Sequence, residues 1–266
     1  ETEWNKDICI EIYDNISDQL NESFPGFMER AFNSPREMGA LIKGGRELIA
    51  TKGLFIKKKR YGVLIYDMEG DRLDTDGKPG KVKAMGLDLK RSDTPKSVQD
   101  FLSELLTNVL GGSSRDDIIQ HIKQFKKDFK TRPAWEKGTP KRVNNLTRYT
   151  MAYEKTGKCG VGHVMAAINW NRLRKMNGDR YSTAISDGQK VIVCKLKSNP
   201  LNITSIAYPT DQAKLPDWFK ELPFDQLLME DTIVTQKVEN LLGVLSWDLK
   251  IQASSSNAFA DMFSSG

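Results

Sequence analysis

Five cationic side chains gather within nine residues of this sequence, and their spacing has a direct chemical use. They lie in the stretch 52–60, which holds Lys52, Lys57, Lys58, Lys59 and Arg60 and no acidic residue. An apolar, strand-like run from Tyr61 to Tyr66 follows at once. Lysine and arginine neutralise phosphodiester groups and release their counterions, while a strand fixes where they point. The stretch therefore predicts contact with a nucleic-acid backbone, although a solvated lysine cluster that caps a strand has the same composition.

Charge is segregated along the whole chain. The 266 residues carry a net charge of +5, but residues 1–45 and 209–266 each contain 4 Lys/Arg against 9 Asp/Glu. Residues 46–208 therefore carry a net charge of +15, and the stretch 123–148 alone has nine basic residues against two acidic ones. A basic centre between acidic ends is typical of a polyanion-binding surface. Charge alone does not distinguish DNA from RNA or from an anionic membrane.

Histidine and cysteine offer little chemistry of their own here. The three cysteines, Cys9, Cys159 and Cys194, are widely spaced and odd in number, which argues against a disulfide framework or a structural zinc site and fits a reduced compartment. His163 follows Gly162 at the start of an expected helix, where a hydrogen bond to backbone or phosphate is favoured over catalysis. No apolar run approaches the roughly 18 residues of a membrane helix.

The helices and strands that must position these residues can be predicted from the spacing of apolar residues and from the Gly and Pro residues that interrupt it. Four-residue apolar spacing predicts a helix over 4–32, and the polar, glycine-containing stretch 68–81 predicts a turn between strands. Further helices are expected after Ser92-Asp93-Thr94-Pro95 and over 115–130 and 163–176, with strands over 46–50, 53–56, 61–67 and 190–197. The region that follows the helix over 115–130, up to about residue 162, is expected to be irregular and basic. The end of the chain, after the strand over 190–197, is expected to be turn-rich and acidic. The fold class is therefore α+β, with a small antiparallel sheet portion followed by a mainly helical domain.

Four segments, in this order, carry a family resemblance. They are Gly45-Arg46-Glu47 with Lys58-Lys59-Arg60-Tyr61 and Asp67-Met68-Glu69-Gly70, then Met85 to Pro95, then Gly162 to Asn171, and last Phe259-Ala260-Asp261-Met262-Phe263. The chain resembles the C-terminal part of a family B replicative DNA polymerase of the T-even bacteriophage type. The resemblance implies that residues 1–86 end the palm, 87–250 form a duplex-binding thumb, and 251–266 form a flexible tail with a clamp-binding peptide.

Such polymerases are nucleotidyltransferases that use two Mg²⁺ ions held by palm aspartates. The family's metal-binding motif, two aspartates around a threonine, is absent from its expected place. The sequence does contain Asp74-Thr75-Asp76, but these residues lie in a Gly/Pro-rich turn where the family has no such motif. Since the first residue is Glu1 rather than methionine, we expect a piece of a longer protein. The resemblance then implies an upstream polypeptide with the exonuclease, the fingers and the paired aspartates, and a chain that is inactive alone.

The resemblance also assigns roles to single residues. Glu47 matches an accessory palm carboxylate with a catalytic role, although a strand carboxylate that simply pairs with Arg46 or a lysine is equally expected. Lys58, Lys59, Arg60 and Tyr61 match the element that holds the primer end. The remaining candidates for contact with the primer–template duplex are Lys90, Arg91, Lys141, Arg142, Asn144 and His163.

The tail and the partners complete the expectation. Ser254 to Asn257 reads as a tether, and Phe259, Met262 and Phe263 form an apolar peptide that binds a sliding clamp in the family, or else folds back on its own domain. The resemblance places the protein in DNA replication in the cytoplasm of the infected bacterial host, with no membrane partner. A non-catalytic duplex-binding or processivity module remains the alternative, and an RNA-binding protein is a weaker one because no aromatic-rich recognition motif is present.

Overall fold

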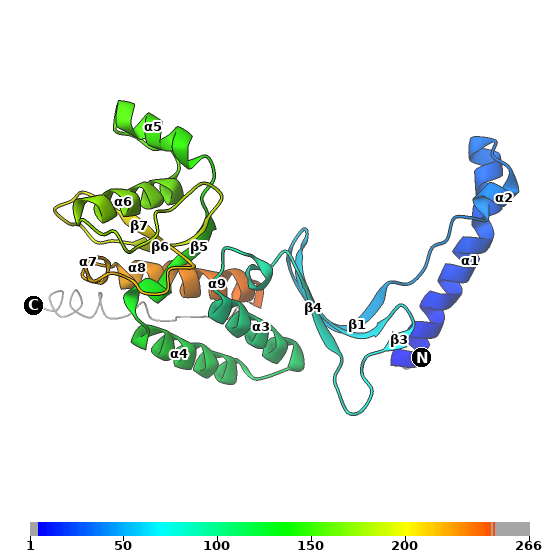
Figure 1. The fold of residues 1–266 in the computed structure, drawn as a ribbon. Helices are drawn as coiled ribbons and strands as arrows, with labels where there is room; N and C mark the ends of the chain where they lie inside the picture. Colours follow the sequence, from blue (N-terminus) through cyan, green and yellow to red (C-terminus); the bar gives the residue numbers. More distant parts are fainter. Residues whose placement is uncertain (1–4, 246, 248–266) are drawn as a thin grey trace, which may run out of the picture. The chain divides into compact units, whose positions relative to one another are not determined.

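The computed structural model describes residues 5–245 and 247. The chain divides into two compact units, one made of residues up to 55 and 61–85, and the other of 56–60 and the residues from 86 onward. Figure 1 colours the first unit from blue to cyan and most of the second from green to orange. Both contain helices and a small antiparallel sheet, so the α+β class expected from the sequence is confirmed.

The first unit joins a long helix to a sheet. Its helices are α1 (Lys6–Phe32) and α2 (Arg36–Gly39), and its strands are β1 (Leu48–Lys57), β2 (Arg60–Met68), β3 (Asp71–Arg72) and β4 (Lys81–Met85). Strand β2 is central and pairs with β1 on one side and with β3 and β4 on the other, with Tyr61 opposite Met85. The buried core comes from Leu54 of β1 and from Val63 to Tyr66 of β2.

Local signals explain the helix boundaries of this unit. Asn5 accepts a hydrogen bond from the Ile8 amide and so caps the start of α1, and Asn33 ends the helix in the left-handed conformation with φ 49°. The two short strands expected at 46–50 and 53–56 are a single strand, β1, because Gly53 continues the extended backbone and the ring of Phe55 lies over it. The expected polar turn contains the short strand β3.

The second unit is mainly helical around a second sheet. Its elements are η1 (Asp88–Lys90), α3 (Lys96–Gly111), α4 (Arg115–Thr131), η2 (Ala134–Lys137), β5 (Thr139–Arg142), α5 (Leu146–Thr156), α6 (Gly162–Met176), β6 (Lys190–Lys195), β7 (Ser205–Pro209), α7 (Asp217–Lys220), α8 (Gln226–Glu230), η3 (Asp231–Thr235), α9 (Gln236–Leu242) and η4 (Gly243–Leu245). Strand β6 is central between β5 and β7, and α6 packs against β7 (Figure 1).

Aromatic packing holds this unit together. Trp170 of α6 is fully buried, donates from Nε1 to the Thr183 carbonyl at 2.9 Å, and packs against Trp218 and Phe219. Trp170 is therefore a core residue of this unit. Helices α3 and α4 meet through Phe101 and Phe125, whose ring centroids are 3.9 Å apart.

Two parts of the second unit differ from expectation. The stretch expected to be irregular contains β5 and α5, and the stretch expected to be a turn-rich tail contains β7 and the helices from α7 to α9. Strand β5 is only four residues long and gains its hydrogen bonds from β6, about fifty residues later in sequence. Such non-local pairing leaves little local periodicity, which is why the sequence pattern did not reveal it.

Candidate nucleic-acid interface and the Glu47 edge

The turn between β1 and β2 presents two lysines. Lys58 and Lys59 form the turn, both are exposed, and neither makes an ion pair with another residue in the part of the chain that the structure describes. Lys59 adopts φ 62°, a left-handed conformation that costs a non-glycine residue about 1 kcal/mol. Tyr61 follows on β2, half-buried, with its ring 5.9 Å from that of Phe55. The turn therefore leaves two unneutralised cations in solvent.

Gly86, the residue after β4, packs closely against the turn between β1 and β2. Its φ is +64°, and a Cβ atom at this position would lie 2.2 Å from the carbonyl oxygen of Lys59. Only glycine fits such a close approach. The contact holds the turn next to the segment 86–95, which supplies the acidic residues described below.

Asp88 is the centre of a group of cations. Its carboxylate lies 3.7 Å from Arg60, 3.6 Å from Arg91 and 3.4 Å from Lys237, and its side chain is mostly buried. Lys237 of α9 also donates to Thr94 Oγ1 at 3.0 Å. One carboxylate thus orients three cations that are up to 177 positions apart in the chain numbering.

Asp93 extends this group. Arg91 donates to both oxygens of Asp93 at 3.0 Å, and Lys141 of β5 donates to one of them at 3.0 Å. These bonds, those from Arg91 foremost, hold the pKa of the Asp93 carboxyl well below its usual range. We call the six residues the Asp88–Asp93 cluster; they are Asp88, Asp93, Arg60, Arg91, Lys141 and Lys237. Four cations face two carboxylates, so the cluster keeps a net charge of +2.

A cavity of about 520 Å³ adjoins the cluster. Its polar lining includes Asp88, Asp93, Lys141, His163, Lys195, Ser205, Gln236, Lys237 and Asn240. His163 lies at the start of α6; burial first and then Lys141 lower its pKa, while a hydrogen bond to the backbone of Arg142 opposes the shift. The imidazole is therefore neutral near pH 7 and contributes a hydrogen-bonding group, not a charge.

In the part of the chain that the structure describes, the other candidates for duplex contact form no hydrogen bond or ion pair with Asp88 or Asp93 and are not members of this cluster. Arg142 is exposed and donates to the Gly188 carbonyl at 3.0 Å, and Asn144 and Lys90 are exposed. The structure thus brings Arg60, Arg91, Lys141 and His163 to one place. Sequence reasoning missed Asp88 as the central acid and Lys237 as a cation of the cluster, because Lys237 lies in the acidic stretch expected to form the tail.

Glu47 lies at the edge of the first sheet, just before β1. Its carboxylate is exposed and accepts a hydrogen bond from Lys83 of β4 at 2.7 Å, which lowers its pKa. Its carbonyl accepts from the Glu69 amide at 3.0 Å. The sequence predicts a pairing of Glu47 with either Arg46 or a lysine. The structure shows the lysine, Lys83, while Arg46 forms ion pairs with Asp14 and Asp67.

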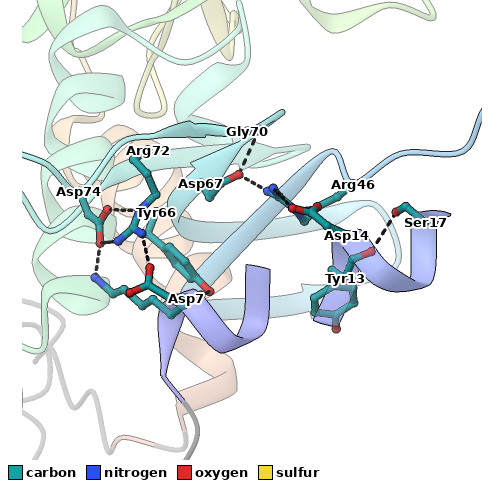
Figure 2. A network of polar contacts seen from close by, with 11 residues as sticks. Asp7, Tyr13, Asp14, Ser17, Arg46, Tyr66, Asp67, Gly70, Arg72 and Asp74 are labelled. Atoms are coloured by element: carbon teal, nitrogen blue, oxygen red, sulfur yellow. Dashed lines mark hydrogen bonds and ion pairs between the residues drawn. The ribbon is translucent and has the colours of Figure 1, made fainter. Parts of the chain in front are cut away.

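Arg46 is buried in a separate network shown in Figure 2. Its guanidinium bonds Asp14 of α1 and the buried Asp67 of β2, with 2.9 Å to Asp14 Oδ1. In the same figure, Arg72 bonds Asp7 at 2.5 Å and Asp74 at 2.9 Å. Helix α1 is thus held to the sheet of its unit through two of its own carboxylates.

The carboxylates that the structure describes do not form a metal site by themselves. No group of three or more His, Cys, Asp or Glu side chains that could hold a metal occurs among residues 5–245. Asp74, in the Asp-Thr-Asp turn, is already bonded to Arg72 and to Lys6, and Glu47 is paired with Lys83. A two-metal centre therefore does not fit this donor set.

Two further expectations concern other parts of the chain. The candidate clamp-binding residues Phe259, Met262 and Phe263 lie outside the described residues. Among the helices that the structure describes, none is both long and apolar enough to cross a membrane.

Comparison with known proteins gives two relatives. The DNA-directed DNA polymerase of Enterobacteria phage T4 is 30% identical over 176 residues, which cover 66% of this chain and 18% of that polymerase. The DNA-directed DNA polymerase of Escherichia phage RB69 is 30% identical over 159 residues, or 59% of this chain and 17% of that polymerase. The match spans less than a fifth of the length of either relative. No protein-family model matches the chain.

Proposed function

Because this chain is related to the family B DNA polymerases of T-even-type bacteriophages, we propose that it is the end of the palm and the thumb of a template-directed DNA polymerase. It grips the primer–template duplex and completes the palm of an upstream polypeptide. That polypeptide carries the exonuclease, the fingers and the paired aspartates. The assembled enzyme replicates DNA in the cytoplasm of the infected bacterial host.

The Asp88–Asp93 cluster is the observation that carries the DNA-binding part of this proposal. Its two carboxylates hold Arg60, Arg91, Lys141 and Lys237 in fixed positions and leave an excess of positive charge. Fixed cations need little reordering when a phosphate arrives, so less conformational entropy is lost on binding. Contacts of this kind recognise the backbone and not the bases, which suits an enzyme that must bind any sequence.

The carboxylates available in the described part of this chain support the need for an upstream partner that supplies the metal ligands. Glu47 is the one candidate palm carboxylate, and it is paired with a lysine instead of with other carboxylates. We propose that the upstream aspartates hold the Mg²⁺ ions, which assist phosphoryl transfer, and that Glu47 is an accessory group at the edge of that site. The chain alone then binds duplex but makes no DNA.

Duplex binding is tested by measuring affinity for a primer–template of arbitrary sequence at several salt concentrations. A surface with several phosphate contacts loses affinity steeply as salt rises, and the affinity does not depend on sequence. A change from Arg91 to Ala should weaken binding of every duplex by a similar factor. Affinity that is insensitive to salt would remove the DNA-binding part of the proposal.

Primer extension tests the catalytic part. This chain alone, the upstream polypeptide alone and the mixture are compared in the presence of magnesium. Synthesis only by the mixture supports a completed palm. Duplex binding without synthesis in any reaction favours the second candidate, a non-catalytic duplex-binding or processivity module, which agrees with the lack of a metal-binding group among residues 5–245.

The tail gives a third, separate test. We propose that Phe259, Met262 and Phe263 bind the sliding clamp, as an apolar peptide on a tether would. A synthetic peptide of residues 254–266 should bind the clamp of the same phage. The same peptide with alanine at both phenylalanines should bind at least about tenfold more weakly.

A further inference from the structure

Helix α1 exposes a continuous apolar stripe. The large apolar side chains on it are Ile12 (37% exposed), Tyr13 (52%), Ile16 (53%), Leu20 (46%) and Phe27 (50%). At 3.6 residues per turn these five positions fall within about 120° of the helix circumference. The helix is 27 residues long and contains no buried residue. An apolar face of this length is not typical of a helix that faces water.

Two carboxylates on the opposite side of α1 bond the rest of its unit. Asp7 bonds Arg72 and Asp14 bonds Arg46, both on or next to the sheet. On the helical wheel these two acids lie opposite the apolar stripe, together with Glu11, Asp18 and Glu22. Figure 2 shows Asp7 and Asp14 directed at the two arginines, with the Tyr13 ring on another side of the helix. Helix α1 therefore attaches to its sheet through these carboxylates, and the described residues of its unit leave the apolar stripe exposed.

We propose that this apolar stripe of α1 is the docking surface for the upstream polymerase polypeptide; this inference rests on the proposed function. The relatives are more than five times longer than the segment that they share with this chain. The remainder of such a polymerase is the partner that the proposed function requires. A helix laid in an apolar groove is a common recognition mode, read as anchors at i, i+4, i+8 and i+15, as at Ile12, Ile16, Leu20 and Phe27.

The chemistry of the stripe narrows the kind of partner. Its five large side chains are uncharged, while the acids Glu11, Asp18 and Glu22 lie on the opposite side of the helix and make no ion pair with other described residues. A groove lined by apolar side chains is therefore complementary to the stripe. A nucleic acid presents phosphates and no such groove. The partner is accordingly a protein with an apolar groove.

The test compares two variants of the full chain for binding to the upstream polypeptide. Ile16→Asp places a carboxylate in the stripe, and Asn15→Asp places the same group one residue away on the polar side. Both side chains are exposed, so both variants should fold, which circular dichroism verifies. We expect Ile16→Asp to raise the Kd at least about tenfold, and Asn15→Asp to change it by less than about twofold.

Three results would overturn the docking surface. They are equal binding by Ile16→Asp and the wild type, no complex with the wild-type chain at micromolar concentration, and self-association of the chain that Ile16→Asp abolishes. Primer extension separates this inference from the proposed function. A complex that Ile16→Asp weakens but that never extends a primer supports the docking surface and removes the polymerase role. Extension that Ile16→Asp leaves unchanged supports the polymerase role and removes the docking surface.

Discussion

The Nζ atom of Lys83 lies 2.7 Å from Oε1 of Glu47, and this pair joins the residue before β1 to strand β4. Since β1 and β4 pair with opposite sides of β2, the ion pair spans the central strand of the first sheet. Glu47 is mostly exposed, and its nearest charged partner is a cation. The carboxylate is therefore kept ionised and in a defined position.

Replacing Lys83 by Met should raise the pKa of Glu47. The hydrogen bond from Lys83 is the largest cause of the lowered pKa, followed by the charge of the same lysine, so removing both returns the carboxyl toward its ordinary value. An NMR titration of the side-chain carboxyl carbon measures this pKa directly. Lys81→Met, two residues earlier on the same strand, is the control and should leave the pKa of Glu47 in place. An unchanged Glu47 pKa in Lys83→Met would show that the pair does not form in solution.

Glu47→Gln should separate catalysis from DNA binding. If Glu47 acts at the edge of the polymerase site, the amide variant lowers the rate of primer extension by the assembled enzyme by about tenfold or more. Duplex affinity of the chain stays within about twofold, because Glu47 is not part of the Asp88–Asp93 cluster. Glu29→Gln, an exposed carboxylate on α1, serves as the control. Wild-type extension by Glu47→Gln would leave this residue as an ordinary partner of Lys83.

Arg46→Met should unfold the first unit more easily. The variant leaves the carboxylate of Asp67 buried without its cation, and breaking a buried ion pair from one side costs about 3 kcal/mol or more. Urea denaturation followed by circular dichroism measures the loss. Arg36→Met is the matched control, because Arg36 pairs with Glu29 at the surface and such pairs contribute about 1 kcal/mol or less. Equal losses in the two variants would contradict a structural role for Arg46.

Local sequence signals predicted part of this fold, and long-range pairing accounts for the rest. Helices α1, α3, α4 and α6 were expected within a few residues of their observed bounds, because each has apolar periodicity and a recognisable start or stop. Strand β5 depends on β6, and β7 and the helices after it were hidden in a stretch whose acidic composition suggested turns. Their apolar residues are nevertheless spaced as in a helix; the buried ones include Met229, Ile233, Val234, Val238 and Leu241.

The candidate site was predicted to a similar degree. The lysine-rich turn is a run of neighbouring residues, so the sequence alone locates it. The Asp88–Asp93 cluster joins residues from five elements or segments, and no spacing reveals that Lys237 reaches Asp88. The apolar stripe of α1 was recognised as helical periodicity, but only the structure shows that the described residues of its unit leave these side chains exposed.

Lys58 and Lys59 should each contribute about one phosphate contact. Replacing both by Ala removes two exposed cations that no described carboxylate neutralises, so the slope of log affinity against log salt should fall in magnitude by about 2. Fluorescence anisotropy with a labelled primer–template, repeated from low to moderate salt, gives the slope. Lys43→Ala, in the acidic part of the chain before residue 45, is the control. A slope that stays at the wild-type value would mean that the turn is only a solvated strand cap.

Asp93→Asn should lower stability and raise DNA affinity. Asp93 is the acceptor for Arg91 and Lys141, and the loss of these charge-assisted bonds should cost about 1 kcal/mol at neutral pH. The folded-state pKa of Asp93 is lowered, so this stabilisation is complete above the ordinary carboxyl pKa of about 3.9 and is lost as the pH falls below it. The difference between wild type and variant should thus be constant from about pH 5 to 8 and shrink on acidification.

The same substitution removes a negative charge that competes with DNA phosphates for Arg91 and Lys141. Duplex affinity at low salt should therefore rise a few-fold, the opposite direction from stability. Asp100→Asn, whose carboxylate pairs with Lys96 on the exposed side of α3, should change stability by about 0.5 kcal/mol or less. Denaturation at several pH values and anisotropy with the same protein provide both readings. Weaker DNA binding by Asp93→Asn would mean that the carboxylate is needed to orient the two cations more than it shields them, and that the cluster binds phosphate through its geometry and not through its excess charge.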